Sequence, residues 1–503
     1  MPRRSAPPAA AAPSSAAAAP ARKRGPAVPP PRRPRGTGRG GGGTGHHAGR
    51  PVAAPWPVTG MLFPPLDAAA QTALARLPEA LERVRPLSAA HRRSLPEDIA
   101  ALSRALTAER AELRRPYWSR PAFVSAYLYY FLPWNLVRLT RLFRGLPLPP
   151  PGQGEALLMD AGSGPLTVPL ALWLARPEWR SAPVRVLALD SAAQPLELGR
   201  ALFAAWAELL GAPGWPVRLE RGPLESLAAR ALPLVRGARA RPWLITAANV
   251  LNEVRPARGG HAGAGVRDED AGDAWEADAG DRVDERLERL LEAWSPLLAA
   301  PVRRGDDGAG ADAGASPALL FVEPGTRLGG TTMMRLREAA LAGGLSAYAP
   351  CTQDDPCPLA RGAWCHFTFS PEGAPQWLAA LSARAGLAKR SLSLSPLLLG
   401  APGEEGGFGR SRGDGSAAPE ARVLSSPFAV PGVRGQARYA CAACGLALLE
   451  DAGALPSGAC VRLVAGGEGP GRESRPRRDH RSGAQIFAAP ARGGPCGKFG
   501  KKS

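Results

Sequence analysis

Residues 156–165 read Ala-Leu-Leu-Met-Asp-Ala-Gly-Ser-Gly-Pro, and this stretch decides the fold. An apolar run of strand length ends in the carboxylate Asp160, and a turn with two glycines follows it. The next segment, 166–174, is apolar enough to predict the start of a buried helix. A strand, a glycine-rich loop and a helix in this order are typical of nucleotide-binding α/β domains, because glycine lets the backbone turn tightly and approach a ligand.

A second apolar run, 184–190, also ends in an acid, at the interval where such folds place a carboxylate that binds a ribose. The Asp-x-Gly-x-Gly spacing of the first loop differs from the three-glycine dinucleotide fingerprint. It is typical of S-adenosylmethionine (SAM) methyltransferases, in which the loop lies against the methionine part. From these two segments we predict the cofactor-binding residues Asp160, Gly162, Ser163, Gly164 and Asp190.

The rest of the domain alternates predicted strands with helical patterns, which indicates a parallel sheet with right-handed crossovers. The predicted strands are 156–160, 184–189, 217–220, 243–248 and 318–322, and the most distinct helical patterns are 196–210 and 284–298. Gly-, Ala-, Asp- or Ser-rich inserts at 255–283, 303–316 and 401–421 are predicted to be surface loops.

Polar groups follow the fourth predicted strand at Asn249, Asn252 and Glu253, where ligands bind in such sheets. We count Asn249 among the cofactor-binding candidates. The segment lacks the Asn/Asp-Pro-Pro-Tyr motif of base-amino methyltransferases, so these residues either contact a ligand or cap the next helix. The catalytic residue is unknown.

The net charge of +19 over 503 residues resembles that of a nucleic-acid-binding protein, but its distribution places it at the ends. Residues 1–60 hold ten Lys and Arg and no acid, and 462–503 hold ten against three acids. Both ends are predicted to be disordered. The first lacks a signal peptide, and the apolar run 123–137 is short for a membrane span, which predicts a soluble intracellular protein.

A helical pattern runs from Leu66 to about Arg144 and includes the aromatic cluster 127–135, Tyr-Leu-Tyr-Tyr-Phe-Leu-Pro-Trp-Asn. Such a cluster either stacks on RNA bases or packs a helical cap against the next domain, and we favour packing.

Three of the seven cysteines, Cys351, Cys357 and Cys365, lie within fifteen residues among prolines, and a Cys-x2-Cys pair follows at Cys441 and Cys444. In an intracellular protein they are predicted to be metal ligands or free thiols rather than disulfides. Four thiolates hold either zinc or an iron–sulfur cluster, and the spacing does not separate the two. Cys460 and Cys496 are predicted to be bystanders.

Together these features resemble the small-ribosomal-subunit methyltransferase-like family, known from mitochondrial ribosomes with bacterial relatives. The resemblance covers residues 66–455 and rests on 127–135, 160–165, 249–253, 322–325 and the cysteine loop. It implies a SAM methyltransferase fold, association with small-subunit ribosomal RNA (rRNA) and ribosomal proteins, and a four-iron four-sulfur cluster. The implied ligands are Cys351, Cys357, Cys365 and Cys441. Cys441 is preferred to Cys444 because the family's cysteine stands four residues before a glycine, here Gly445.

We therefore predict a Rossmann-like α/β SAM methyltransferase fold with a helical N-terminal region and a cysteine-bound metal module. The predicted function is a SAM-dependent rRNA methyltransferase-like protein of the small subunit, and the alternative is a non-catalytic assembly factor that binds rRNA. Zinc is the alternative metal, and neither DNA nor a membrane is expected as a partner. The predicted location of the protein is the cytoplasm if its source is a bacterium and the mitochondrion if its source is a eukaryote.

The predicted divisions of the chain are a tail at 1–60, helices at 61–150, the methyltransferase-like domain at 151–400 with its cysteine loop at 349–367, an insert at 401–421, C-terminal strands at 422–460 and a tail at 461–503.

Overall fold

The computed structural model describes residues 56–107, 117–152, 154–237, 240–251, 271–299, 317–359, 363–402, 419–463 and 477–489, with the backbone alone for 271–282. The predicted loop 303–316 and most of 255–283 and 401–421 lie outside these ranges, as do Asn252, Glu253 and Cys496.

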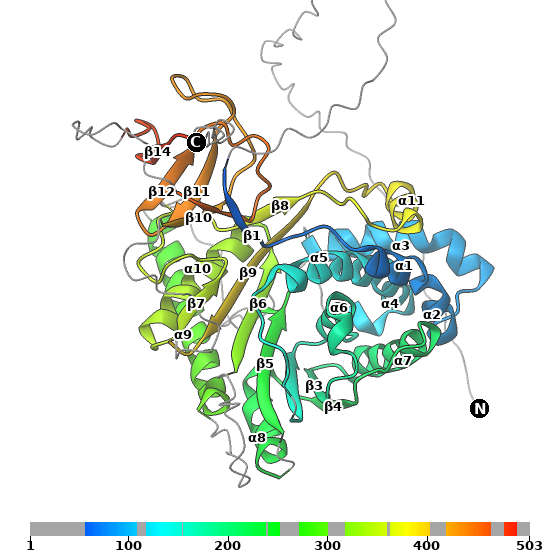
Figure 1. The fold of residues 1–503 in the computed structure, drawn as a ribbon. Helices are drawn as coiled ribbons and strands as arrows, with labels where there is room; N and C mark the ends of the chain where they lie inside the picture. Colours follow the sequence, from blue (N-terminus) through cyan, green and yellow to red (C-terminus); the bar gives the residue numbers. More distant parts are fainter. Residues whose placement is uncertain are drawn as a thin grey trace, which may run out of the picture. The chain divides into compact units, whose positions relative to one another are not determined.

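An eight-stranded mixed sheet forms the centre of the α/β part (Figure 1). Its strand order is β4-β3-β2-β5-β6-β9-β7, and β8 pairs with β9. Strand β9 runs antiparallel to β6, whereas β2 to β6 are all parallel. The strands are β2 (Ala156–Ala161), β3 (Val184–Asp190), β4 (Val217–Arg221), β5 (Arg241–Ala248), β6 (Ala318–Pro324), β7 (Ser346–Ala349), β8 (Phe367–Phe369) and β9 (Leu392–Gly400). Each of the five predicted strands is present, as β2 to β6.

Helices cover both faces of this sheet, so its central strands are apolar on both sides rather than alternating. Side chains of α6 (Thr167–Ala175) and α7 (Ala193–Leu209) belong to one core cluster. Side chains of α8 (Leu227–Gly237), α9 (Ala271–Leu298) and α10 (Arg327–Ala342) belong to the other. Helix α9 begins within the predicted loop 255–283, because a helix anchored by buried leucines in its later turns propagates into the preceding sequence.

The helices that precede the sheet pack on the face of α6 and α7 (Figure 1). Helix α5 lies against α6, and α2 lies against α7. The π-helical turn η3 leads directly into α5 without a break in the chain. These elements are α1 (Ala68–Ala75), α2 (Leu77–Val84), α3 (Ala89–Thr107), η2 (Tyr117–Ser119), α4 (Pro121–Ala126), η3 (Tyr127–Phe131) and α5 (Leu132–Gly145), and α11 (Gln376–Arg384) contacts α3 and η3.

A second sheet of six strands joins segments from both ends of the described chain. Its order is β1-β13-β10-β11-β12-β14. The strands are β1 (Val58–Met61), β10 (Glu420–Val423), β11 (Arg438–Ala442), β12 (Gly445–Leu449), β13 (Ala459–Arg462) and β14 (Gln485–Phe487).

Strands β1 and β14 lie inside the ranges 1–60 and 461–503, for which the sequence predicted disordered tails. They are ordered because each adds to an edge of the six-stranded sheet, β1 to β13 and β14 to β12. Composition alone does not reveal this pairing, since the partner strands lie far away in the sequence or are short.

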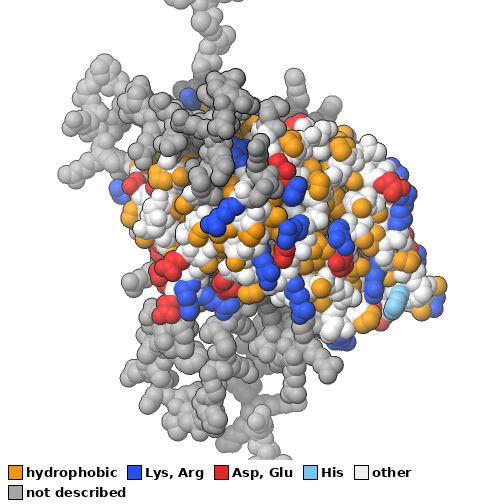
Figure 2. All heavy atoms as spheres, turned by 90° about the horizontal axis from the view of Figure 1, so that it is seen from below, with side chains coloured by type: hydrophobic (Ala, Val, Ile, Leu, Met, Phe, Trp, Pro, Cys, Tyr) orange, Lys and Arg blue, Asp and Glu red, His pale blue; other side chains and the backbone are white. Residues whose placement is uncertain are grey.

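The surface of the described part carries mixed charge. On the face in Figure 2, Lys and Arg side chains are scattered, with acidic and apolar side chains between them. The most strongly basic stretch of the chain, in residues 1–55, lies outside the described ranges. Among the helices that the structure describes, none is both long and apolar enough to cross a membrane.

Trp56 shows how firmly the first described residues are held. It is 3% exposed, packs in the core of the six-stranded sheet and donates its indole N–H to the Glu450 carbonyl oxygen at 2.8 Å. We expect Trp56→Ala to lower the free energy of unfolding by about 3–5 kcal/mol, measured by chemical denaturation. Val58→Ala, at a position that is 45% exposed, is the matched control and should change it by less than about 0.5 kcal/mol. Equal effects of both substitutions would contradict the assignment of Trp56 to this core.

Candidate functional site

Asp160 ends β2 and is fully buried between this strand and β5. Its Oδ2 accepts a hydrogen bond from the Ser163 hydroxyl, and its Oδ1 accepts one from the Thr246 hydroxyl, each at 2.6 Å. One carboxyl group therefore joins the end of β2, the glycine loop and β5. The order of the sheet reverses at β2, and ligands bind at the carboxyl ends of strands beside such a switch point.

Burial makes the ionised form of Asp160 unfavourable. Desolvation raises its pKa from 3.8 to about 7, with a smaller contribution in the same direction from Asp190. The hydrogen bonds from Ser163 and Thr246 lower the pKa and offset part of the effect. Near neutral pH the Asp160 carboxyl group is thus partly protonated while it accepts the hydrogen bond from the loop.

The two loop glycines are required by backbone conformation. Gly162 has φ 68° and Gly164 has φ 52°, in the left-handed region that glycine adopts without strain. A Cβ atom on Gly162 would lie 2.2 Å from Cγ1 of Val250, so this side chain packs directly on the loop. A Cβ atom on Gly164 would meet nothing within 4 Å, and the loop is therefore open at this position.

Asp190 at the end of β3 holds the same loop from the other side. Its Oδ2 accepts from the backbone N–H of Gly164 at 2.9 Å. Its Oδ1 accepts from the backbone N–H of Ala192, just before α7, also at 2.9 Å. The structure thus brings Asp160, Ser163, Gly164 and Asp190 into one hydrogen-bonded group.

Asn249 follows β5 on the same edge of the sheet and has φ 61°, which asparagine tolerates better than most residues. Its backbone N–H donates to the carbonyl of Val322 at 2.8 Å. Nearby, Oε1 of the fully buried Glu323 accepts from the Leu251 N–H at 2.8 Å. The polar turns after β5 and β6 are therefore tied to each other.

Sequence reasoning missed two contributors to this site, Thr246 and Val250. A hydroxyl inside the otherwise apolar strand β5 was the available signal for Thr246. Nothing local in the sequence marked Val250, whose contact with Gly162 depends on the pairing of β2 with β5.

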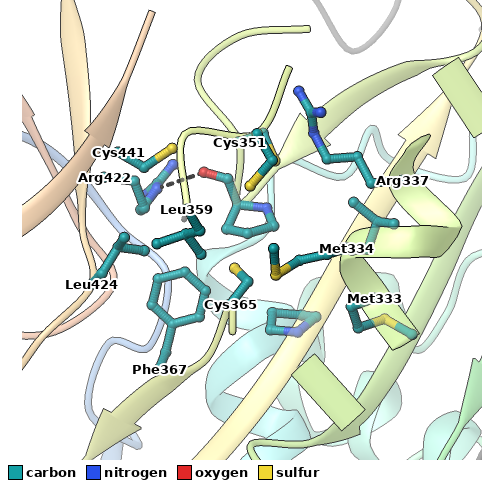
Figure 3. Close-up of a pocket in the computed structure, with 14 residues that line it drawn as sticks. Met333, Met334, Arg337, Cys351, Leu359, Cys365, Phe367, Arg422, Leu424 and Cys441 are labelled. Carbon is teal, nitrogen blue, oxygen red and sulfur yellow. Dashed lines mark hydrogen bonds between the residues drawn. The ribbon is translucent and has the colours of Figure 1, made fainter. Parts of the chain in front are cut away.

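A second candidate site lies between the two sheets, where Cys351, Cys357, Cys365 and Cys441 line one pocket. Figure 3 shows the sulfur atoms of Cys351, Cys365 and Cys441 directed at the same space. Burial, and then the neighbouring thiols Cys351 and Cys357, raise the pKa of Cys441 to about 12. The same causes raise the pKa of Cys365. In the described ranges no three His, Cys, Asp or Glu side chains already stand in a metal-binding arrangement.

The other two described cysteines lie apart from this pocket. Cys444 is exposed, and Cys460 is buried in β13 with its thiol 3.4 Å from the Glu420 carboxylate. The structure therefore separates Cys441 from Cys444, which the sequence left open.

Two arginines border the cysteine pocket and supply positive charge. Arg422 donates its Nε–H to the carbonyl of Pro350 at 3.0 Å. Arg337 is buried and donates through Nη2 to the carbonyls of Gln353 and Asp355, at 2.9 and 2.8 Å. Its Nε and Nη1 are buried without a hydrogen-bond partner among the described residues. Unpaired N–H groups of a buried cation beside four thiols suit an anionic group in the pocket.

Comparison with known proteins gives one family. Residues 309–373 match the model of the family described as mitochondrial small ribosomal subunit Rsm22. This segment contains β6, α10, β7, β8 and three of the four pocket cysteines. The match confirms the family resemblance predicted from the sequence, for this part of the chain. No curated protein sequence matches the chain.

Several solved structures of methyltransferases are similar to part of the chain. Precorrin-6y C5,15-methyltransferase from Geobacter metallireducens is 12% identical, with 49% of this chain and 79% of that chain covered and a TM-score of 0.23. TrmN from Thermus thermophilus is 14% identical, with 55% and 53% covered and a TM-score of 0.26, so the chain spans about half of its length. The rRNA methyltransferase aviRa from Streptomyces viridochromogenes is 16% identical, with 37% and 73% covered and a TM-score of 0.22. Scores this low carry no argument about chemistry.

The raised pKa of Asp160 predicts how stability depends on pH. The folded protein keeps a proton on this group that the unfolded chain, with its ordinary pKa of 3.8, releases. The free energy of unfolding should therefore fall as the pH rises from about 4 to about 7, by roughly 4 kcal/mol at most. In Asp160→Asn this loss should disappear, as measured by urea denaturation at several pH values. Glu225→Gln, at an exposed carboxylate, is the control and should keep the wild-type slope. An unchanged slope in Asp160→Asn would refute the assignment.

Proposed function

We propose that this chain is a SAM-binding, methyltransferase-like protein that acts on, or helps to assemble, the small ribosomal subunit. The observation that carries the proposal is the bonded group of Asp160, Ser163, Gly164 and Asp190 at the switch point of the sheet. The strand order, with antiparallel β9 inserted between β6 and β7, is the order of SAM methyltransferase folds. The ribosomal part of the proposal is supported by the family match over 309–373.

In this proposal SAM lies against the open side of the glycine loop at Gly164, and the Asp190 carboxylate accepts the ribose hydroxyls. Oδ1 of Asp190 accepts from the Ala192 N–H and, at 3.4 Å, from the Ser191 hydroxyl, whereas Oδ2 accepts from the Gly164 N–H and has room for a second hydrogen bond. Asn249 would contact the cofactor from the end of β5. When bound, SAM supplies an electrophilic methyl group, and the protein's part is to position it near a nucleophilic base atom.

The alternative function is a non-catalytic assembly factor that uses the same fold to bind rRNA. It is favoured by the packing of Val250 onto Gly162 and by the absence of an Asn/Asp-Pro-Pro-Tyr motif after β5. One assay, with purified small subunits and radiolabelled SAM, distinguishes the enzyme from the non-catalytic assembly factor. Methyl transfer to rRNA supports the enzyme, whereas SAM binding with subunit association and no transfer supports the assembly factor.

We further propose that Cys351, Cys357, Cys365 and Cys441 hold a four-iron four-sulfur cluster. The support comes from four cysteines outside any disulfide around one pocket and from the unpaired N–H groups of Arg337, which can donate to cluster sulfides or thiolates. Three ligands come from the loop before β8 and the fourth comes from β11. A cluster here would join the loop to the six-stranded sheet and stabilise both.

Asp190 is the residue to substitute in a test of cofactor binding. Loss of a hydrogen bond to a charged group costs about 1.5–3 kcal/mol, so Asp190→Ala should weaken SAM binding roughly ten- to a hundredfold in calorimetry. Glu97→Ala, which removes an exposed carboxylate from α3, should bind SAM as the wild type does. If the wild type does not bind SAM, or if Asp190→Ala binds it normally, the proposal fails.

Cys441 and Cys444 form a matched pair for the metal proposal, because they are close in sequence and only Cys441 lines the pocket. Anaerobically purified wild type should be brown, with iron and sulfide in about equal amounts. Cys441→Ser should lose the colour and some thermal stability, whereas Cys444→Ser should keep both. Zinc without iron in the wild type would replace the cluster by a structural zinc site. A metal-free protein of full stability would exclude both metals.

A further inference from the structure

One stripe of residues along η3 and α5 is not fully buried. Between Phe123 and Phe143 every residue is buried except Tyr127, Phe131, Asn135 and Arg138. Their separations of four, four and three residues place them on one side of the helix, and we call them the α5 stripe. The helix has already buried its apolar residues in the core, so this stripe is what it presents outward: two aromatic rings, an amide and a guanidinium.

The rings of the stripe continue a row of stacked aromatic side chains. Tyr117 and Tyr127 stack with their ring centroids 5.9 Å apart, and Tyr127 and Phe131 stack at 5.8 Å. Phe131 then meets the edge of Tyr130 at 5.1 Å. Tyr127 also contacts the Trp118 ring at 4.8 Å, and both Tyr127 and Phe131 are half-buried. A row of partly exposed aromatic rings is the kind of surface on which unpaired nucleic-acid bases stack.

Two cations stand at the far end of the row. Lys389, in the segment between α11 and β9, lies 5.8 Å from the Tyr130 ring centroid. Burial, and then the charge of Arg138, lower the pKa of Lys389. Arg138 donates through Nη1 to the side-chain oxygen of Asn135 at 2.9 Å, while its buried Nε has no partner among the described residues. Among the described residues no carboxylate forms an ion pair with either cation, and the neutral Tyr130 lies near both.

This arrangement is unfavourable for the protein alone. Removing a cation from water costs free energy that an anion normally offsets, and a second cation nearby adds repulsion. The pair is nevertheless held in place, because the Tyr130 hydroxyl donates to the carbonyl of Leu387, two residues before Lys389, at 3.1 Å. An anionic ligand would satisfy both cations.

The stripe begins at the edge of the sheet that carries the glycine loop. Helix α5 runs alongside α6 in the same direction, since Arg176 at the end of α6 donates to the carbonyls of Phe143 and Leu146 at the end of α5. Helix α6 starts just after the glycine loop, so the first turns of α5 lie near that edge. Lys389 lies there too, because the pairing of Leu394 with Pro324 places the start of β9 at the carboxyl end of β6.

We propose that the α5 stripe and Lys389 bind single-stranded RNA, with bases stacked on Tyr127 and Phe131 and a phosphate between Arg138 and Lys389. The inference rests on the proposed function and names the surface on which an RNA strand reaches the cofactor edge. Bases on the two rings and one phosphate at the two cations match the order along the stripe, in which the rings come first and the cations follow.

The test measures binding of the full chain to a fluorescent oligouridylate of about twelve nucleotides at several salt concentrations. Lys389→Met should weaken binding and reduce the log–log salt slope by about 0.7, the value for one phosphate contact on a single strand. Phe131→Leu should weaken binding about five- to a hundredfold and leave the slope unchanged. Arg93→Met, which removes an exposed charge from α3, is the control and should bind as the wild type does.

Two further readouts separate this proposal from simpler explanations. Lys389→Met should have an equal or higher melting temperature than the wild type, because it removes a half-buried charge that is repelled by Arg138, so loss of binding cannot come from unfolding. SAM binding by the same variants should be unchanged. If Lys389→Met loses SAM binding and keeps RNA binding, or if both variants bind RNA as the wild type does, the stripe proposal is overturned while the proposed function stands. A wild type that binds neither SAM nor small subunits would overturn the proposed function instead.

Discussion

The carboxyl group of Asp160 is the interaction on which the α/β part depends. It is buried where the strand order reverses between β2 and β5, and it receives hydroxyl hydrogen bonds from the glycine loop and from β5. Burying a carboxyl group costs free energy unless it is hydrogen-bonded. The Ser163 and Thr246 hydroxyls must therefore stay within hydrogen-bond distance of it. The position of Ser163 then determines where the backbone of Gly164 meets Asp190. Three strands and a loop are thus held in register by two acidic side chains.

The six-stranded sheet depends on a different constraint, which is the pairing of segments from opposite ends of the chain. Residues near 58 and 460 lie side by side, and the indole of Trp56 reaches the backbone of Glu450. The same sheet meets the loop before β8 through Arg422 and through the pocket of four cysteines. The two sheets therefore share one polar and sulfur-lined contact, and a bound metal at this place would act on the stability of both.

The sequence predicted those features whose signal is local. Asp160, Gly162, Gly164 and Asp190 stand at strand ends and turns that are recognisable within a few residues, and β2 to β6 read as apolar runs. The sequence did not predict β1, β14 or the start of α9, because pairing or helix propagation orders them against their composition. The roles of Thr246 and Val250 in the site also depend on contacts between strands. So does the position of Cys441, rather than Cys444, in the pocket. The cysteine pocket could be anticipated only through family resemblance, since spacing alone does not bring residues 76 positions apart together.

Two sites lie near the carboxyl edge of the sheet: the glycine loop, whose polar groups are hydrogen-bonded, and the cations Arg138 and Lys389, whose charges are not paired within the described residues. The glycine loop is already hydrogen-bonded without any ligand, so binding there would require little ordering of the protein, and preorganisation of this kind favours affinity. At Arg138 and Lys389 the balance is opposite, because neither cation has an anionic partner among the described residues and the protein alone bears their repulsion. Packing of α5 against α6 requires no charge at Arg138, and Lys389 lies outside both helices. Their unpaired charge next to stacked rings is therefore better explained by a ligand than by packing.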